Sequence, residues 1–151
     1  MAALREKSLL LTGYLEYLLK LDIDASGERV YSIITPADPA WRGAQLSLRL
    51  EEEGLLETVM EVLEREGVVV DERRPDVVRV APAPFYNTFE EVWQFVSVWR
   101  EAVGEARGRR KREGEGEKVE TGEAVGRKDG EGKGGVMVDG GVEKGAWGGI
   151  K

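Results

Sequence analysis

The chain has 151 residues and a formal net charge of −7, and it contains neither cysteine nor histidine. These absences exclude a disulfide scaffold, a thiolate metal site and the usual histidine general base. No apolar stretch approaches the roughly 20 residues of a membrane span, and charges interrupt the place where a signal peptide is apolar. We therefore expect a soluble, cytoplasmic protein that makes no membrane contact.

The composition divides the chain into two parts. Residues 1–103 hold 19 acidic and 11 basic side chains, whereas residues 104–151 hold 10 and 11, together with 15 of the 20 glycines. A segment poor in apolar residues and dense in Gly, Glu and Lys cannot bury enough surface to offset its chain entropy. We predict a folded domain over 1–103, large enough for a modest core, and a disordered low-complexity tail over 104–151.

The first half of the domain is predicted to contain one helix and two strands. Apolar residues recur at helical spacing over residues 2–21, and residues 24–28 then indicate a turn. Residues 29–35 are rich in β-formers and predict a strand, while two prolines make 36–43 an irregular loop. Strict alternation of leucine with polar residues over 44–50 predicts a second, half-buried strand.

The next segment is predicted to be a helix followed by two strands. Residues 51–67 carry one apolar stripe and an acidic start, and Gly67 is placed to cap the helix at its C-terminus. Residues 68–70, VVV, predict a short strand, and residues 71–76 predict a turn. Residues 77–81, VVRVA, predict a further strand, and two prolines follow it.

A final helix is predicted over residues 87–103, where Thr88 and Glu91 make a capping box. The element order is then helix, strand, strand, helix, strand, strand, helix. This order predicts an α+β fold in which helices pack on one mostly antiparallel sheet, forming two layers.

Arg79 lies inside an apolar strand and has two interpretations. On pattern alone it is an edge-strand charge paired with Asp76 or a nearby glutamate. Pro82 and Pro84, however, end the strand directly after it, and ligand sites are common at strand ends. A guanidinium there would suit a carboxylate, because it offers a bidentate fork and keeps its charge.

Other charged stretches favour structural interpretations. Residues 51–53, EEE, are typical of a solvated helix start rather than a cation site. Residues 107–112, RGRRKR, resemble a nucleic-acid patch, but the acidic net charge disfavours this, and we predict a solvated linker and no nucleic-acid partner. The glycine-rich GEGEK and GEGKGG do not join a strand to a helix, which excludes a phosphate loop.

Three stretches together resemble the C-terminal part of kynureninase, in the same order along the chain: LTGYLEYLL, IITPADPAWRGAQLSL and LEREGVVVDERRPDVVRVAPAPFYNTFEEVWQFV. The resemblance runs from about Leu4 to Val103. It implies the small C-terminal domain of a pyridoxal-phosphate enzyme with the aspartate-aminotransferase fold (fold type I). The family acts as a homodimer in tryptophan catabolism and NAD biosynthesis. It hydrolyses L-kynurenine or 3-hydroxykynurenine to alanine and anthranilate or 3-hydroxyanthranilate.

The resemblance implies a single site residue in this chain. In such enzymes a small-domain arginine holds the α-carboxylate of the substrate, and the matching position is Arg79. The lysine that holds pyridoxal phosphate belongs to the large domain, and neither Lys7, Lys20 nor the tail lysines match it. We therefore expect no catalytic, cofactor-binding or metal-binding residue here, but a fragment that is inactive without the large pyridoxal-phosphate domain.

An alternative from another class is a non-catalytic α+β binding or regulatory module. Small domains of this layout bind ligands or other proteins through a sheet face or a helix. In this alternative the first predicted helix or the sheet face is an interaction surface.

Overall fold

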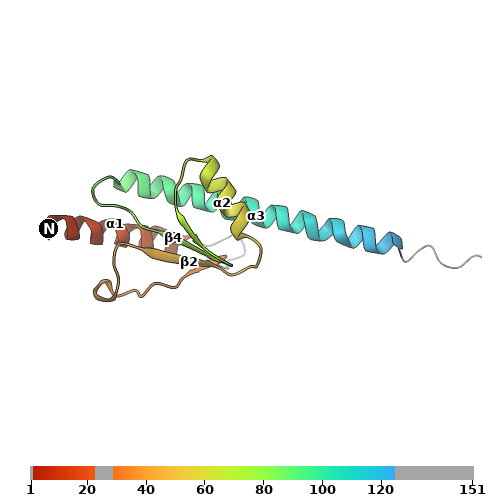
Figure 1. Ribbon diagram of the computed structural model, residues 1–151, viewed down its shortest axis with the longest axis horizontal. Helices are drawn as coiled ribbons and strands as arrows, with labels where there is room; N and C mark the ends of the chain where they lie inside the picture. Colours follow the sequence, from red (N-terminus) through yellow and green to blue (C-terminus); the bar gives the residue numbers. More distant parts are fainter. Residues whose placement is uncertain (1, 23–28, 125–151) are drawn as a thin grey trace, which may run out of the picture.

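The computed structural model describes residues 2–22 and 29–124 (Figure 1). The elements along the chain are α1 (Ala2–Leu21), β1 (Tyr31–Ile33), a 3₁₀ turn (Pro39–Trp41), β2 (Leu46–Leu50), α2 (Leu56–Arg65), β3 (Asp71–Arg73), β4 (Val77–Val80) and α3 (Phe89–Ala124). The four strands form one sheet in the order β1-β2-β4-β3, and all neighbours are antiparallel. The helices lie on one face of this sheet, which confirms the predicted α+β architecture.

The core lies between the sheet and the helices. Alternation along β2 turns Leu46, Leu48 and Leu50 into it, and Val78 and Val80 of β4 join them. Trp99 of α3 is fully buried at its centre and meets the ring of Tyr31 edge-on, with the ring centroids 5.3 Å apart. One sheet face is therefore apolar and covered, while the other carries the polar residues of the same strands.

A buried ion pair fastens the β1–β2 loop to α1. Arg42 Nη2 lies 2.5 Å from Glu16 Oε2, and the two side chains are only 5% and 12% exposed. Lys20 Nζ lies 2.5 Å from the other oxygen of Glu16, and Thr12 Oγ1 donates to the carbonyl of Ala44 at 3.2 Å. Burial acts to raise the pKa of Glu16, but the hydrogen bonds from Lys20 and Arg42 outweigh it, so this pKa is lowered.

Both predicted helix caps are present. The amide of Thr88 donates to Glu91 Oε2 at 2.7 Å, and the amide of Glu91 donates to Thr88 Oγ1 at 3.2 Å, which is the reciprocal capping box. Gly67 has a φ of 74° and its amide donates to the carbonyl of Glu64. The amide of Val68 reaches the carbonyl of Leu63 at 2.8 Å, which completes a Schellman end to α2.

The third strand is not where the sequence places it. The prediction of a strand over 68–70 is wrong, because β3 comprises Asp71–Arg73, inside the predicted turn. The amide of Val68 is taken by the end of α2. In the pairing of β3 with β4, Asp71 lies opposite Arg79 and Arg73 lies opposite Val77. The hairpin turn therefore comprises residues 74–76. The predicted turn over 24–28 lies outside the described residues.

The remaining early elements are shorter than predicted. The first two strands occupy only Tyr31–Ile33 and Leu46–Leu50. Helix α2 begins at Leu56 rather than at residue 51. Gly54, with a φ of 79°, lies in the turn that separates β2 from α2.

The last helix continues well beyond its predicted end at Val103. Helix α3 reaches Ala124, so residues 104–124, which the sequence assigns to the tail, are helical. Ala106 is still buried, and Arg109 bridges Glu61 and Glu105 at 2.8 and 2.7 Å. These contacts tie the first extra turns to α2, an interaction that composition alone does not reveal. Residues 125–151 of the predicted tail lie outside the described part of the chain.

Candidate functional site

Arg79 lies on the sheet face that points away from the helices. Its neighbours Val78 and Val80 face the core, whereas Arg79 stands in a cross-strand row between Ser47 of β2 and Asp71 of β3. Strand β4 is paired on both sides, so the interpretation of Arg79 as an edge-strand charge is wrong. The backbone that carries this guanidinium is held by two ladders.

The guanidinium of Arg79 has two partners in the structure. Its Nη2 donates to Gln45 Oε1 at 2.5 Å, and its Nη1 lies 3.1 Å from Asp71 Oδ2. Arg73 Nη1 holds the other oxygen of Asp71 at 2.6 Å. An ion pair predicted from the pattern is therefore present, but its acid is Asp71 and not Asp76.

These contacts leave donors available. A guanidinium has five N–H groups, and the described residues engage two nitrogens of Arg79, each through one oxygen. The Arg79 side chain is 33% exposed and that of Asp71 is 51% exposed. An incoming carboxylate can thus reach the fork beside Asp71, or displace it while Asp71 keeps its bond to Arg73.

The loop after β4 carries two exposed aromatic rings. Strand β4 ends at Val80, and the loop over 81–88 is folded by the amide of Ala83, which donates to Asn87 Oδ1 at 2.7 Å. Phe85 and Tyr86 are 71% and 82% exposed. No pattern in the sequence marks these two rings, and their exposure distinguishes them from the core aromatics.

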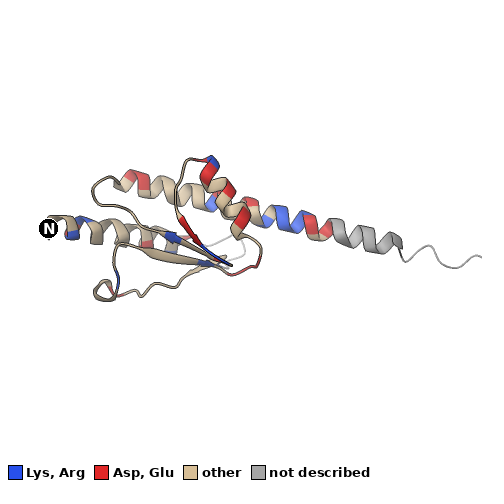
Figure 2. Cartoon of the chain, viewed as in Figure 1, with Lys and Arg blue, Asp and Glu red and all other residues tan. Residues whose placement is uncertain are grey.

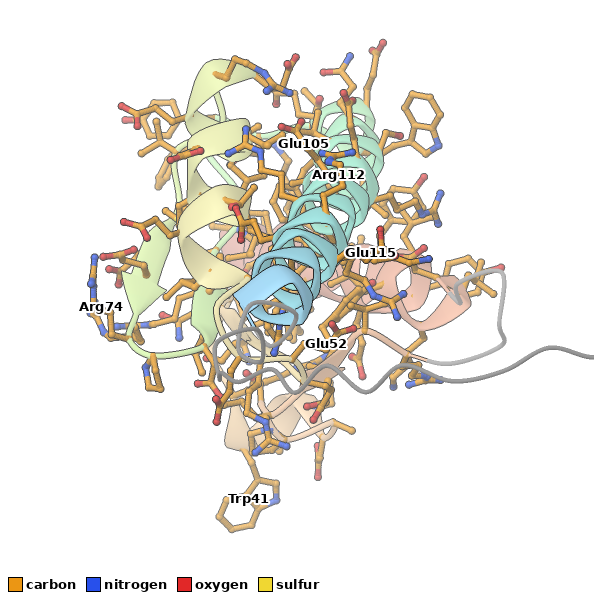
Figure 3. All side chains as sticks on the ribbon, turned by 90° about the vertical axis from the view of Figure 1, so that its right-hand side faces the viewer. Trp41, Glu52, Arg74, Glu105, Arg112 and Glu115 are labelled. Carbon is orange, nitrogen blue, oxygen red and sulfur yellow. The ribbon has the colours of Figure 1, made fainter. Side chains whose placement is uncertain are left out.

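The acidic run at 51–53 and the basic run at 107–112 meet each other. Arg107 Nε lies 2.7 Å from Glu52 Oε1, and Arg110 Nη1 lies 3.8 Å from Glu52 Oε2 and also donates to the carbonyl of Glu53. Figure 3 shows Glu52 next to α3, with Glu115 further along the same helix. The two runs therefore form ion pairs that hold the turn before α2 against α3. Neither run predicts this contact by itself.

Metal and membrane sites find no support in the part of the chain that the structure describes. Residues 2–22 and 29–124 contain no group of three or more His, Cys, Asp or Glu placed to hold a metal ion. Over the same residues, no helix is both long and apolar enough to cross a membrane.

The residues that the structure describes do not by themselves fit pyridoxal phosphate. Lys20 is bound to Glu16 on α1, and Lys111 lies in a shallow groove on α3. A hollow of about 370 Å³ between the 66–70 segment and α3 is lined by residues such as Val70, Pro82 and Phe95, and its lining contains no lysine or arginine. Within the described residues no amine stands in an enclosed pocket where a cofactor aldehyde could be attached.

Comparison with known proteins decides the family. The profile described as Kynureninase C-terminal domain matches residues 4–99, which is more than half of the chain. The chain belongs to the kynureninase family. Kynureninase 1 of Emericella nidulans is 59% identical over 106 residues, covering 70% of this chain and 22% of the relative. Kynureninase 1 of Aspergillus oryzae is 60% identical over 113 residues, covering 74% and 23%.

A third kynureninase, Kynureninase 1 of Aspergillus niger, is 64% identical over 94 residues, which cover 60% of this chain and 20% of the relative. The chain therefore spans about a fifth of the length of the curated kynureninases it matches. The matched part is the C-terminal domain, and it contains Arg79, Gln45 and Asp71.

Proposed function

We propose that this chain supplies the substrate-carboxylate-binding domain of a kynureninase. The reaction is pyridoxal-phosphate-dependent hydrolysis of L-kynurenine or 3-hydroxykynurenine to alanine and anthranilate or 3-hydroxyanthranilate, carried out by a cytoplasmic homodimer in tryptophan catabolism. The attachment of the cofactor comes with the large domain that the relatives carry. The chain is inactive without it.

The observation that carries the proposal is the placement of Arg79. Its guanidinium is part-exposed on a strand fixed from both sides, and Gln45 holds one of its nitrogens, so the fork has a set direction. A carboxylate bound there accepts charge-assisted hydrogen bonds, each worth about 1.5–3 kcal/mol. Such a bond fixes one end of an amino-acid substrate and so orients the rest of it.

The test uses a chimera, defined as Emericella nidulans Kynureninase 1 in which the segment matching residues 4–99 is replaced by this chain's. Arg79→Ala removes about 2–4 kcal/mol of carboxylate binding, so kcat/KM for kynurenine should fall roughly 30- to 1000-fold. Arg79→Lys keeps the charge but loses the fork, and should recover only part of the loss. Anthranilate fluorescence measures the rate.

Arg49→Ala is the matched control. Arg49 lies on the same sheet face and is 48% exposed, with only a 3.6 Å contact to Glu51. Its replacement should change kcat/KM by no more than about twofold. A kynurenine analogue that lacks the α-carboxylate should react equally in the wild-type and Arg79→Ala chimeras. Equal kcat/KM for kynurenine in Arg79→Ala and Arg49→Ala would refute the assignment.

A further inference from the structure

Helix α1 presents an exposed apolar stripe that the core does not use. Leu10, Tyr17 and Leu21 are 57%, 59% and 57% exposed, although they are large apolar or aromatic residues. They follow one another at spacings of seven and four residues, so they share one side of the helix. On α3, Phe89 and Trp93 are 46% and 56% exposed, one turn apart.

The stripes on the two helices form one surface. The rings of Tyr14 and Phe89 meet edge-on with their centroids 5.6 Å apart. Further along α3, Arg100 Nε lies 2.8 Å from Oδ1 of Asp22, the residue that follows the end of α1. The helices therefore run side by side in the same direction, as Figure 1 shows. We call this surface the outer helical face. It comprises Leu10, Tyr14, Tyr17, Leu21, Phe89 and Trp93.

The α1 part of the outer helical face is poor in charged residues, whereas its α3 part lies beside the exposed Glu90 and Glu91. Residues 8–15 of α1 contain no charged residue, and the middle of α1 is uncharged in Figure 2. Helix α2, in contrast, exposes Glu57, Glu61 and Glu64. With about half of each of five large side chains exposed, the face offers on the order of 500 Å² of apolar surface, the upper range for a monomer. Such a face is suited to a covered, desolvated interface.

We infer that the outer helical face is the docking surface for the N-terminal part of a kynureninase chain. The inference rests on the proposed function, because it names the part of the enzyme that this domain serves. The family match is to a C-terminal domain and begins at residue 4, in the first turn of α1, so the rest of such a chain precedes this segment in sequence. The matched region is only about a fifth of those relatives, so a much larger part of their chain is joined to the domain at the N-terminal end of this helix.

Hydroxyl-radical footprinting of the intact 151-residue chain and of the chimera tests the inference. Tyr17 and Trp93 should be modified roughly fivefold or more slowly in the chimera than in the free chain, because the core of an interface is desolvated. Val69, which is 97% exposed and lies off this face, is the dose reference. Unchanged modification of both residues would overturn the inference. Modification in the free chain that falls as its concentration rises would overturn it too, in favour of a second copy.

A second measurement covers the case of a chimera that does not fold. The 151-residue chain is co-expressed with the N-terminal part of the Emericella nidulans relative as a separate, tagged chain. Wild-type chain and Val69→Glu should co-purify with it, whereas Tyr17→Glu should not. Co-purification of Tyr17→Glu at the wild-type yield, or no co-purification of the wild type, counts against the docking surface.

These readouts do not depend on catalysis. Protection of the outer helical face together with an unaffected Arg79→Ala rate would leave the docking surface standing and refute the carboxylate role. Loss of activity in Arg79→Ala, with no protection of the outer helical face, would support the carboxylate role and refute the docking surface.

Discussion

Replacing Arg42 by methionine should destabilise the domain far more than replacing an exposed arginine. The change keeps most of the apolar stem and removes the guanidinium that lies 2.5 Å from Glu16. Breaking a buried pair costs about 3–5 kcal/mol, because a charge remains buried without its partner. Lys20 still contacts Glu16, so we take the lower end, about 3 kcal/mol. For a domain of this size that corresponds to a fall in Tm of roughly 12–24 °C.

Arg49→Met is the control for this substitution. Its ion pair with Glu51 is 3.6 Å long and both side chains are more than two-fifths exposed, so its loss should cost no more than about 1 kcal/mol. Urea unfolding followed by circular dichroism gives both free energies, provided that the m-values agree. An Arg42→Met chain as stable as Arg49→Met would show that the pair between α1 and the loop contributes nothing.

The pH dependence gives an independent check on the same pair. The pKa of Glu16 is lowered in the folded state, so its contribution to stability is present above the ordinary value of 4.5 and is lost as pH falls through the lowered pKa. In Arg42→Met the carboxyl is buried with one partner fewer, and its protonation relieves the penalty. The difference in the free energy of unfolding between wild type and Arg42→Met should therefore become smaller as pH falls from 7 to about 3. A difference in unfolding free energy that does not change with pH would refute the claim that the Arg42–Glu16 ion pair causes it.

Three further outcomes follow from the structure. The 151-residue chain mixed with pyridoxal phosphate and kynurenine should produce no anthranilate fluorescence, and product formation at enzyme-like rates would contradict the proposed division of labour. Thr88→Ala should lower the free energy of unfolding by about 0.5–2 kcal/mol through loss of the capping box, whereas Thr88→Ser should not. A chain ending after Val103 should be less stable in urea than one ending after Glu115 by roughly 2 kcal/mol, because it lacks buried Ala106 and the pairs of Glu105 and Arg109. Equal stability would instead support the domain boundary predicted at residue 103.

Local signals in the sequence were sufficient for the existence of the three helices and for two of their caps, but not for the start of α2 or the end of α3. The spacing of Leu11, Leu15 and Leu19 marks the buried side of α1, and all three are almost fully buried. Thr88 and Gly67 act through bonds within a few residues of themselves, so their roles are readable without the fold. The kynureninase resemblance was equally local, since it rests on long continuous stretches, and it is confirmed over residues 4–99.

Long-range choices were not readable in the same way. Three valines at 68–70 are better β-formers than Asp71–Arg73, but the register with β4 decides which residues pair. The position of β4 inside the sheet depends on strand order, which no local pattern encodes, and so Arg79 was placed at an edge. The extra turns of α3 depend on contacts between Arg109 and Glu61, 48 residues apart. The carboxylate-binding role of Arg79 stays a prediction, because it depends on a bound substrate and not on contacts within the chain.

The central position of β4 also limits how this domain can vary. Strand side chains alternate between faces, so inserting or deleting one residue between Asp76 and Val80 would exchange the two faces beyond that point. The guanidinium would then enter the layer that holds Leu46 and Leu48, and a valine would take its place outside. Because ladders on both sides fix the register, a compensating slip would have to occur in β2 and β3 together. Length changes in this hairpin should therefore be tolerated only in its turn, and a library of insertions made in the chimera and scored for kynurenine hydrolysis would reveal that boundary.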